Sequence, residues 1–187
     1  MKIWFTIIVA VSALLIGCSD SVVNPENTIQ NNNQKSWITL PKSQGMAVES
    51  DYSASQVIDG ETGGSFDLNI KYKAKSGANV KIKAKIEVPS GAFTGEKNIT
   101  MIINSANGTA TFYPNTETFN KPLIFDLDVQ GLDLNGVDPG SIDFVCLNQD
   151  GSYQPVEYKK IKVKVDKGEL EVNKALIPHF SIYGWTR

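Results

Sequence analysis

Apolar and polar residues alternate one by one along much of this chain, and this alternation constrains its fold more than any other feature. The clearest runs are residues 66–75 and 80–88, which the turn sequence Ser76-Gly77-Ala78-Asn79 separates. Successive side chains of a β-strand point to opposite faces, so alternation predicts strands with one buried and one solvated face. The two runs therefore predict a long β-hairpin.

Further short runs predict more strands and no helix. They lie near residues 99–104, 109–113, 123–129, 142–147, 156–165, 170–172 and 177–183. Turn sequences such as Asn107-Gly108 and Asp150-Gly151 separate them. Many short strands at this spacing predict an all-β domain, an immunoglobulin-like antiparallel β-sandwich, over residues 37–187. Within it, we expect residues 37–59 to add an edge strand.

The first 17 residues have the pattern of a signal peptide. Lys2 precedes an uncharged, mostly apolar run of 14 residues, too short to span a bilayer comfortably. The run ends in Leu15-Ile16-Gly17-Cys18, which resembles the bacterial lipoprotein signal. The resemblance implies cleavage before Cys18, lipidation of its sulfur and acylation of its new amine, as with palmitate. The alternative is an ordinary secretory peptide whose cysteine is incidental.

The expected location follows from this signal. By its resemblance to enterobacterial sorting, Ser19 favours the outer membrane over the inner membrane of a bacterial cell envelope. Residues 18–36 contain the lipidated cysteine and then an Asn-rich stretch without aromatic residues, which predicts a flexible tether. With Cys18 lipidated, Cys146 has no partner for a disulfide, and we expect it to be a small buried apolar residue.

Four motifs in order carry a second resemblance. They are Gly63-Gly64-Ser65-Phe66, then Val88-Pro89-Ser90-Gly91-Ala92-Phe93, then Phe112-Tyr113-Pro114 with Phe119-Asn120-Lys121-Pro122-Leu123, and finally Pro178-His179-Phe180-Ser181-Ile182-Tyr183. Together they resemble the β-sandwich domain shared by ankyrins, netrin receptors and tight-junction scaffolds, and by many bacterial envelope lipoproteins. The resemblance implies a non-enzymatic interaction or scaffold module.

The last motif also suggests chemistry. Some relatives in the family cleave the tripeptide His-Phe-Ser between Phe and Ser, so the resemblance implies Ser181 as nucleophile, His179 as base and Phe180 as scissile carbonyl. The alternative is a purely structural last strand, in which Phe180 and Ile182 point into the core while His179, Ser181 and Tyr183 point outward.

Lysines suggest a binding surface. Lys71, Lys73 and Lys75 share one face of the first hairpin strand, and Lys81, Lys83 and Lys85 one face of the second, while residues 122–158 hold seven acids and no base. We expect a dipolar domain with a basic face for anionic lipid or acidic glycan, or simply solvated strand faces. The formal net charge of −2 lacks the basic surplus of a nucleic-acid-binding protein.

Other candidate sites are weaker. Asp126, Asp128, Asp133, Asn135 and Asp138 are oxygen ligands, but their spacing matches no calcium loop, so we expect no metal and no cofactor. A carbohydrate-binding module would need Tyr153, Tyr158 or Trp185 in an exposed planar patch. The leading hypothesis is a lipid-anchored envelope module that is not an enzyme and binds an unidentified envelope protein or glycan.

Overall fold

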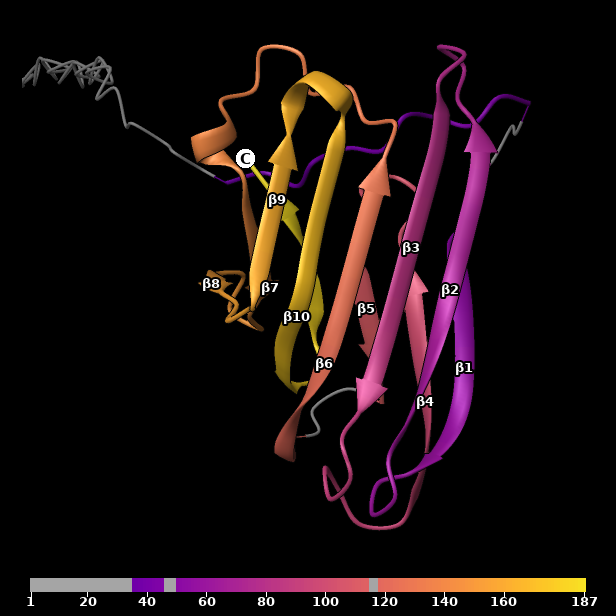
Figure 1. Cartoon of the computed structure of the whole chain (residues 1–187), viewed down its shortest axis with the longest axis vertical. Coiled ribbons are helices and arrows are strands. Elements are labelled where there is room, and N and C mark those ends of the chain that lie inside the picture. The colour runs from indigo at the N-terminus through magenta and orange to yellow at the C-terminus, as the bar shows by residue number, and fades with distance from the viewer. Residues whose placement is uncertain (1–34, 46–49, 115–117) are drawn as a thin grey trace, which may run out of the picture. The chain divides into compact units, whose positions relative to one another are not determined.

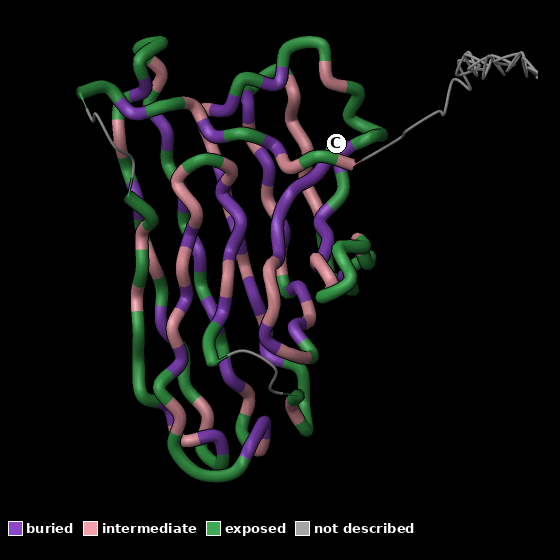
Figure 2. Tube along the Cα trace, turned by 180° about the vertical axis from the view of Figure 1, so that it is seen from behind, coloured by how far each residue is buried: buried purple, intermediate pink, exposed green. Residues whose placement is uncertain are grey.

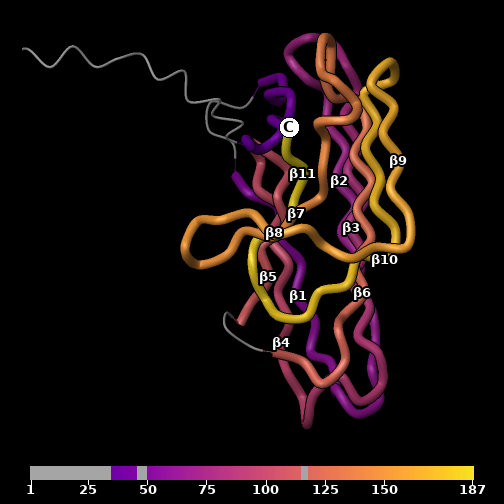
Figure 3. Tube along the Cα trace, turned by 90° about the vertical axis from the view of Figure 1, so that its left-hand side faces the viewer, coloured from indigo at the N-terminus to yellow at the C-terminus, as the bar shows by residue number. Residues whose placement is uncertain are grey.

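Two antiparallel sheets packed face to face make up the folded domain, which confirms the expected β-sandwich (Figure 1). The computed structural model describes residues 35–45, 50–114 and 118–187. The predicted signal peptide, Cys18 and residues 18–34 of the predicted tether lie outside the described residues. Seen from the side, the two sheets form two layers (Figure 3). Every strand pair in the described part of the chain is antiparallel.

One sheet has six strands and the other has five. In spatial order, the six-stranded sheet consists of β1 (Tyr52–Asp59), β4 (Glu96–Ile103), β5 (Ala110–Tyr113), β11 (Ile182–Thr186), β7 (Asp143–Leu147) and β8 (Tyr153–Pro155). The five-stranded sheet consists of β2 (Gly64–Lys73), β3 (Asn79–Val88), β6 (Thr118–Gln130), β10 (Glu169–His179) and β9 (Lys160–Lys164). Two single-turn 3₁₀ helices, η1 (Pro139–Ser141) and η2 (Val165–Lys167), lie in the connections.

Alternation in the sequence becomes alternation in burial. Along β3, every second residue from Val80 to Val88 is buried and the residues between them are exposed. The predicted hairpin is confirmed, because β2 and β3 pair without a break from Gly64 opposite Val88 to Lys73 opposite Asn79. Figure 2 shows the same change between buried and exposed positions along most strands.

Two predicted strands differ from the structure. The sequence pattern predicts one strand over residues 156–165, but the chain forms β8 at residues 153–155 and then β9 at 160–164, in different sheets. Residues 177–183 also divide: β10 ends at His179 in the five-stranded sheet, and β11 begins at Ile182 in the six-stranded sheet. Local apolar patterns are alike on both sides of such crossings, so they do not indicate where a chain changes sheets.

The segment that precedes β1 pairs with the C-terminal end of β11. Ser36 and Arg187 exchange two backbone hydrogen bonds of 3.0 Å, and Ile38 N donates to Trp185 O at 2.9 Å. Residues 36–38 thus pair with the end of β11, which is an inner strand of the six-stranded sheet and not an edge strand. The expected edge strand of this region is confirmed further along, because β1 lies at the edge of the six-stranded sheet.

Aromatic rings fill the space between the sheets. Phe112 is fully buried, and its ring meets the rings of Phe125, Phe180 and Tyr183 with centroids 5.2, 6.1 and 6.0 Å away. Each buried ring of this size contributes about 1.5–3 kcal/mol by leaving water. Within the described ranges, the structure has no helix with the length and apolar character of a membrane span.

Candidate functional site

The outer face of the five-stranded sheet is densely charged. Neighbouring strands place polar side chains of this face in lateral rows. From β2 towards β9 the three rows are Asp67, Lys85 and Asp126; then Asn69, Lys83, Asp128, Glu171 and Lys162; then Lys71, Lys81, Gln130, Glu169 and Lys164. We call these residues the charged face. Carboxylates of β6 and β10 lie between the lysines of β3 and those of β9.

Ion pairs at one side of the charged face hold their groups ionised. Lys162 Nζ lies 2.8 Å from Glu171 Oε2, and Lys164 Nζ lies 2.6 Å from Glu169 Oε2. The hydrogen bond from Lys162 lowers the pKa of Glu171, and the one from Lys164 lowers the pKa of Glu169. These pairs are partly solvated, so each contributes little to stability.

Asp128, in the centre of this face, behaves in the opposite way. Burial raises the pKa of Asp128, and the neighbouring Glu171 adds to the rise. The side-chain amide of Gln130, which donates to both Asp128 oxygens, and the charge of Lys83 oppose it. Desolvation disfavours the charged form of a carboxyl group. Ionisation of Asp128 is therefore less favourable in the folded protein than in water.

The structure corrects the expectation of a dipolar domain with a basic face. Lys83 lies opposite Asp128 and Lys85 opposite Asp126, so acids of the lysine-free stretch stand directly beside the hairpin lysines. Lys75 lies in the turn after β2 and not on the strand. The remaining lysines of the predicted set, Lys71, Lys73, Lys81, Lys83 and Lys85, are exposed on β2 and β3. Any binding role for them stays a prediction.

The outer face of the six-stranded sheet is different in kind. Its charged outward residues, Asp59, Glu96 and Asp143, lie at strand ends. Further outward residues alternate with core residues of the same strands and are uncharged. They are Ser53, Ser55 and Val57 of β1; Asn98, Thr100 and Ile102 of β4; Thr111 and Tyr113 of β5; Leu147 of β7; Tyr153 of β8; and Ile182 of β11. We call them the uncharged face. Val57 and Tyr113 are 59% and 39% exposed, among the most exposed large apolar side chains described.

One row of the uncharged face crosses all six strands. The pairing places in line Ser53, Ile102, Thr111, Ile182, Leu147 and Tyr153. Tyr153 also packs edge-on against Trp37, with ring centroids 5.1 Å apart. Sequence reasoning missed this face, because its residues come from six strands that lie far apart in the chain, between Ser53 and Ile182. The available signal was the uncharged outward set of residues 53–57, 98–102 and 111–113.

His179, Phe180 and Ser181 form the corner at which the chain changes sheets. Phe180 is 4% exposed, and its ring packs edge-on against Phe119 with centroids 4.8 Å apart. The Ser181 hydroxyl donates to Leu147 O at 2.7 Å, whereas His179 Nδ1 lies 3.4 Å from Phe180 O. The hydroxyl is thus engaged on a neighbouring strand and is not bonded to the imidazole that self-cleavage would require.

The corner also corrects the alternative expectation of a regular last strand. Both Phe180 and Tyr183 are buried, although a single strand would have put them on opposite faces. Tyr183 OH donates to His179 O at 2.7 Å, and burial raises the pKa of this phenol, which therefore stays protonated. The crossing between the sheets resets the alternation, which is why both rings point inward.

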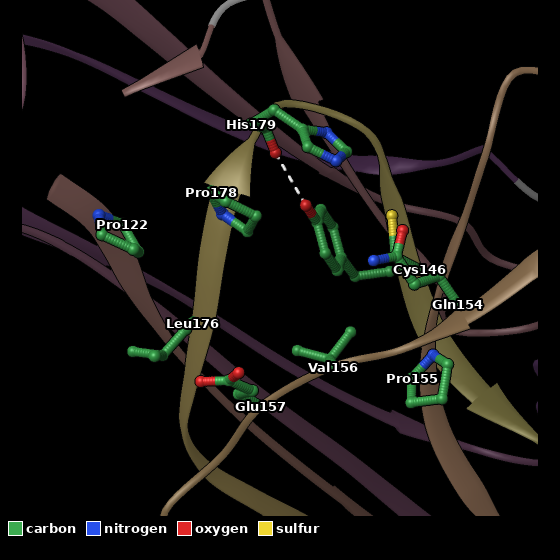
Figure 4. A pocket seen from close by; sticks show the side chains of 10 residues that line it. Pro122, Cys146, Gln154, Pro155, Val156, Glu157, Leu176, Pro178 and His179 are labelled. Carbon is green, nitrogen blue, oxygen red and sulfur yellow. Dashed lines mark hydrogen bonds between the residues drawn. The ribbon is translucent and has the colours of Figure 1, made fainter. Parts of the chain in front are cut away.

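A pocket of about 260 Å³ opens beside the corner, where β8 and the following segment face β10 (Figure 4). Its apolar wall consists of Pro122, Pro155, Val156, Leu176 and Pro178. Figure 4 shows His179 and Glu157 on opposite sides of it. The pocket can hold a small apolar group, with Glu157 and Gln154 as hydrogen-bonding partners. Cys146 lines it and is 4% exposed, a buried apolar residue as expected.

The remaining candidates do not come together. Trp185 is 3% exposed and packs on Phe144, so the expectation that it could join an exposed aromatic patch is wrong. Tyr158 is 41% exposed, whereas Tyr153 is half-buried.

The five candidate oxygen ligands also separate. Asp126 and Asp128 lie on the charged face, while Asp133 and Asp138 accept hydrogen bonds from Asn135 N and Gly140 N in the loop after β6. No group of three or more His, Cys, Asp or Glu side chains in the described ranges could hold a metal ion.

Comparison with known proteins adds no relative: no protein-family model matches the chain, and no curated protein matches it significantly. The fold and its surfaces define the class, an antiparallel β-sandwich with one charged outer face and one outer face whose charges lie at strand ends.

Proposed function

We propose that the protein is a lipid-anchored module of the bacterial cell envelope that binds other envelope components without being an enzyme. Cys18 carries the lipid, and the sandwich displays the binding surface. The outer membrane is the favoured location, because Ser19 follows Cys18. The partner is an envelope protein or glycan, and we favour a protein for the reason given next.

The uncharged face is the observation that carries this proposal. Surfaces of soluble domains usually mix charges of both signs, as the charged face does here. The uncharged face has half-exposed Ile102, Leu147 and Ile182, together with exposed Val57 and Tyr113. Removing water from such a surface costs little free energy. Such surfaces, depleted of charge and containing aliphatic and aromatic side chains, are typical of the centres of protein–protein interfaces.

The anchor fits the position at which the sandwich begins. Lys35, the first described residue, is 17 positions after Cys18 and forms an ion pair with Asp143 of β7. A flexible chain of that length spans roughly 20–25 Å, enough to hold the domain just clear of the lipid headgroups. A diacylglycerol thioether together with an amide-linked acyl chain anchors a protein stably.

Photo-crosslinking in living cells tests the binding surface. A photoreactive residue replaces Thr100 or Ile102 in the full chain, and a matched variant carries it at Lys83 in the centre of the charged face. We expect discrete crosslinked products from the first two positions and none from the third. Products from Lys83 alone would contradict the proposal and favour the charged face.

Fractionation tests the anchor separately. Cys18→Ala is expected to abolish incorporation of a labelled fatty acid and to remove the protein from the membrane fraction, while Cys146→Ala leaves both unchanged. An unlabelled wild-type protein would contradict lipidation and leave the surface proposal standing on its own test.

A further inference from the structure

The four edge strands of the two sheets are protected to different degrees. β8 is three residues long and ends in Pro155. β2 carries Lys71 and Lys73, and β9 carries Lys160, Lys162 and Lys164. Shortness, proline and lysine all prevent an edge from pairing with another strand. β1, by contrast, spans eight residues with the sequence YSASQVID, which contains no lysine, arginine or proline.

The backbone of β1 offers free hydrogen-bonding groups at this edge. Bonded and non-bonded pairs alternate along an antiparallel ladder. Gly60 N donates to Gly95 O at 2.9 Å, and the unbroken register then directs the even-numbered residues of β1 towards β4. Ser53, Ser55 and Val57 therefore direct their N–H and C=O groups away from the sheet. Among the described residues, nothing hydrogen-bonds to these backbone groups.

The side chains of the same residues belong to the uncharged face. Val57 has the largest exposed fraction of the big apolar side chains described, at 59%. An additional strand beside β1 would both complete the backbone hydrogen bonds and cover this side chain. Strand addition to an open sheet edge is an established mode of protein recognition.

We propose that the strand that pairs with β1 is β1 of a second copy of this chain, so that two six-stranded sheets join into one continuous sheet across a two-fold axis. A register centred on Gln56 places Ser55 of each copy opposite Val57 of the other. It also places Asp59 opposite Ser53, so within β1 no like charges face each other. The same pairing at the β2 or β9 edge would bring lysines of the two copies together.

Symmetry favours pairing of β1 with β1 over pairing of β1 with another edge of a second copy. Pairing of β1 with β1 of a second copy gives a closed dimer, because each copy uses its one unprotected edge. Pairing of β1 with a different edge would instead build an open chain of subunits. The dimer does not depend on the lipid anchor; it covers the β1 edge of the uncharged face, including Val57, and leaves the rest of that face open to a partner.

Disulfide trapping with the full chain tests the dimer in its own membrane. Gln56→Cys puts a thiol at the two-fold axis, and Ser65→Cys on the edge strand β2 is the matched control. We expect a product of twice the monomer mass from the first variant on non-reducing gels, and none from the second. Adding Ser55→Pro should abolish the product, because it removes a free-edge N–H and leaves the β1–β4 ladder intact. Val57→Lys, which adds an edge lysine, should have the same effect without any backbone change.

Three outcomes would overturn the proposal. The first is equal trapping by Gln56→Cys and Ser65→Cys. The second is trapping that persists with both Ser55→Pro and Val57→Lys. The third is a Gln56→Cys product whose mass identifies a different protein, which would assign the β1 edge to a heterologous strand.

Discussion

The phenol of Tyr183 donates a hydrogen bond of 2.7 Å to the main-chain oxygen of His179, across the corner at which the chain passes from one sheet to the other. The donor lies on β11 and the acceptor ends β10, so this bond joins the two layers. Ser181 adds a second tie from the corner to Leu147 of β7. The hydroxyl groups of Tyr183 and Ser181 thus hold the backbone of the corner in place.

Removing the phenol oxygen should weaken the corner. Tyr183→Phe leaves the ring in the core but leaves His179 O without its donor, so we expect a loss of about 1–3 kcal/mol in the free energy of unfolding. Urea denaturation measures it. The control is Tyr113→Phe, since Tyr113 is 39% exposed and should not affect the midpoint. An unchanged midpoint for Tyr183→Phe would show that water replaces the phenol.

The peptide bond between Phe180 and Ser181 should remain intact. Because the Ser181 hydroxyl is bonded to Leu147 O, we expect a single uncut species by intact mass spectrometry after prolonged incubation. Ser181→Ala should leave the mass pattern unchanged, apart from the lost oxygen, and reduce stability by about 0.5–1.5 kcal/mol. A C-terminal fragment beginning at Ser181, absent from the Ser181→Ala sample, would establish self-cleavage instead.

A bulge in β10 holds a lysine in a left-handed conformation. Lys174 has φ = 53°, and its N–H donates to Asp126 Oδ1 at 2.7 Å, within the register shift between Val172 and Ala175. The left-handed region costs a residue with a Cβ roughly 1–2 kcal/mol, part of which glycine recovers. We expect Lys174→Gly to raise the thermal midpoint and Lys174→Val to lower it. The opposite order would show that the lysine side chain itself stabilises the bulge.

Neutralising Asp128 should stabilise the protein at neutral pH. Burial raises the pKa of Asp128, so its ionised form is less favourable in the folded than in the unfolded state. Asp128→Asn keeps an oxygen for Gln130 and removes this cost, a gain of less than about 1 kcal/mol because the group is still partly solvated. The gain should disappear as the pH falls below the usual value of 3.8, where the carboxyl group is protonated in both states.

Urea denaturation at pH 7 and pH 3 measures this difference. Asp67→Asn, an exposed substitution on the edge strand of the same face, is the matched control. If Asp128→Asn destabilises the protein at pH 7, the attraction of Lys83 and Lys162 outweighs the cost of burial.

The sequence by itself determined the fold class and most of the strands. Period-two alternation is a local property, and any sandwich must bury one side of each strand, so residues 66–88 predicted the β2–β3 hairpin and its buried face. The same alternation predicts the exposed side for Lys71, Lys73, Lys81, Lys83 and Lys85, whereas Lys75 lies in the turn. Cys146 was expected in the core because its neighbours are apolar.

Only the tertiary structure decided which strands lie side by side. Long-range pairing brings Asp126 and Asp128 next to Lys85 and Lys83, and this turned an expected basic face into one of mixed charge. The same pairing assembles the uncharged face from six strands, and it leaves β1 at an edge. The corner at Phe180 was hidden for a related reason: a strand that ends and a strand that continues in the other sheet have the same local pattern. Alternation specifies which side of a strand is buried, whereas the neighbour of each strand follows from how all the buried sides fit into one core.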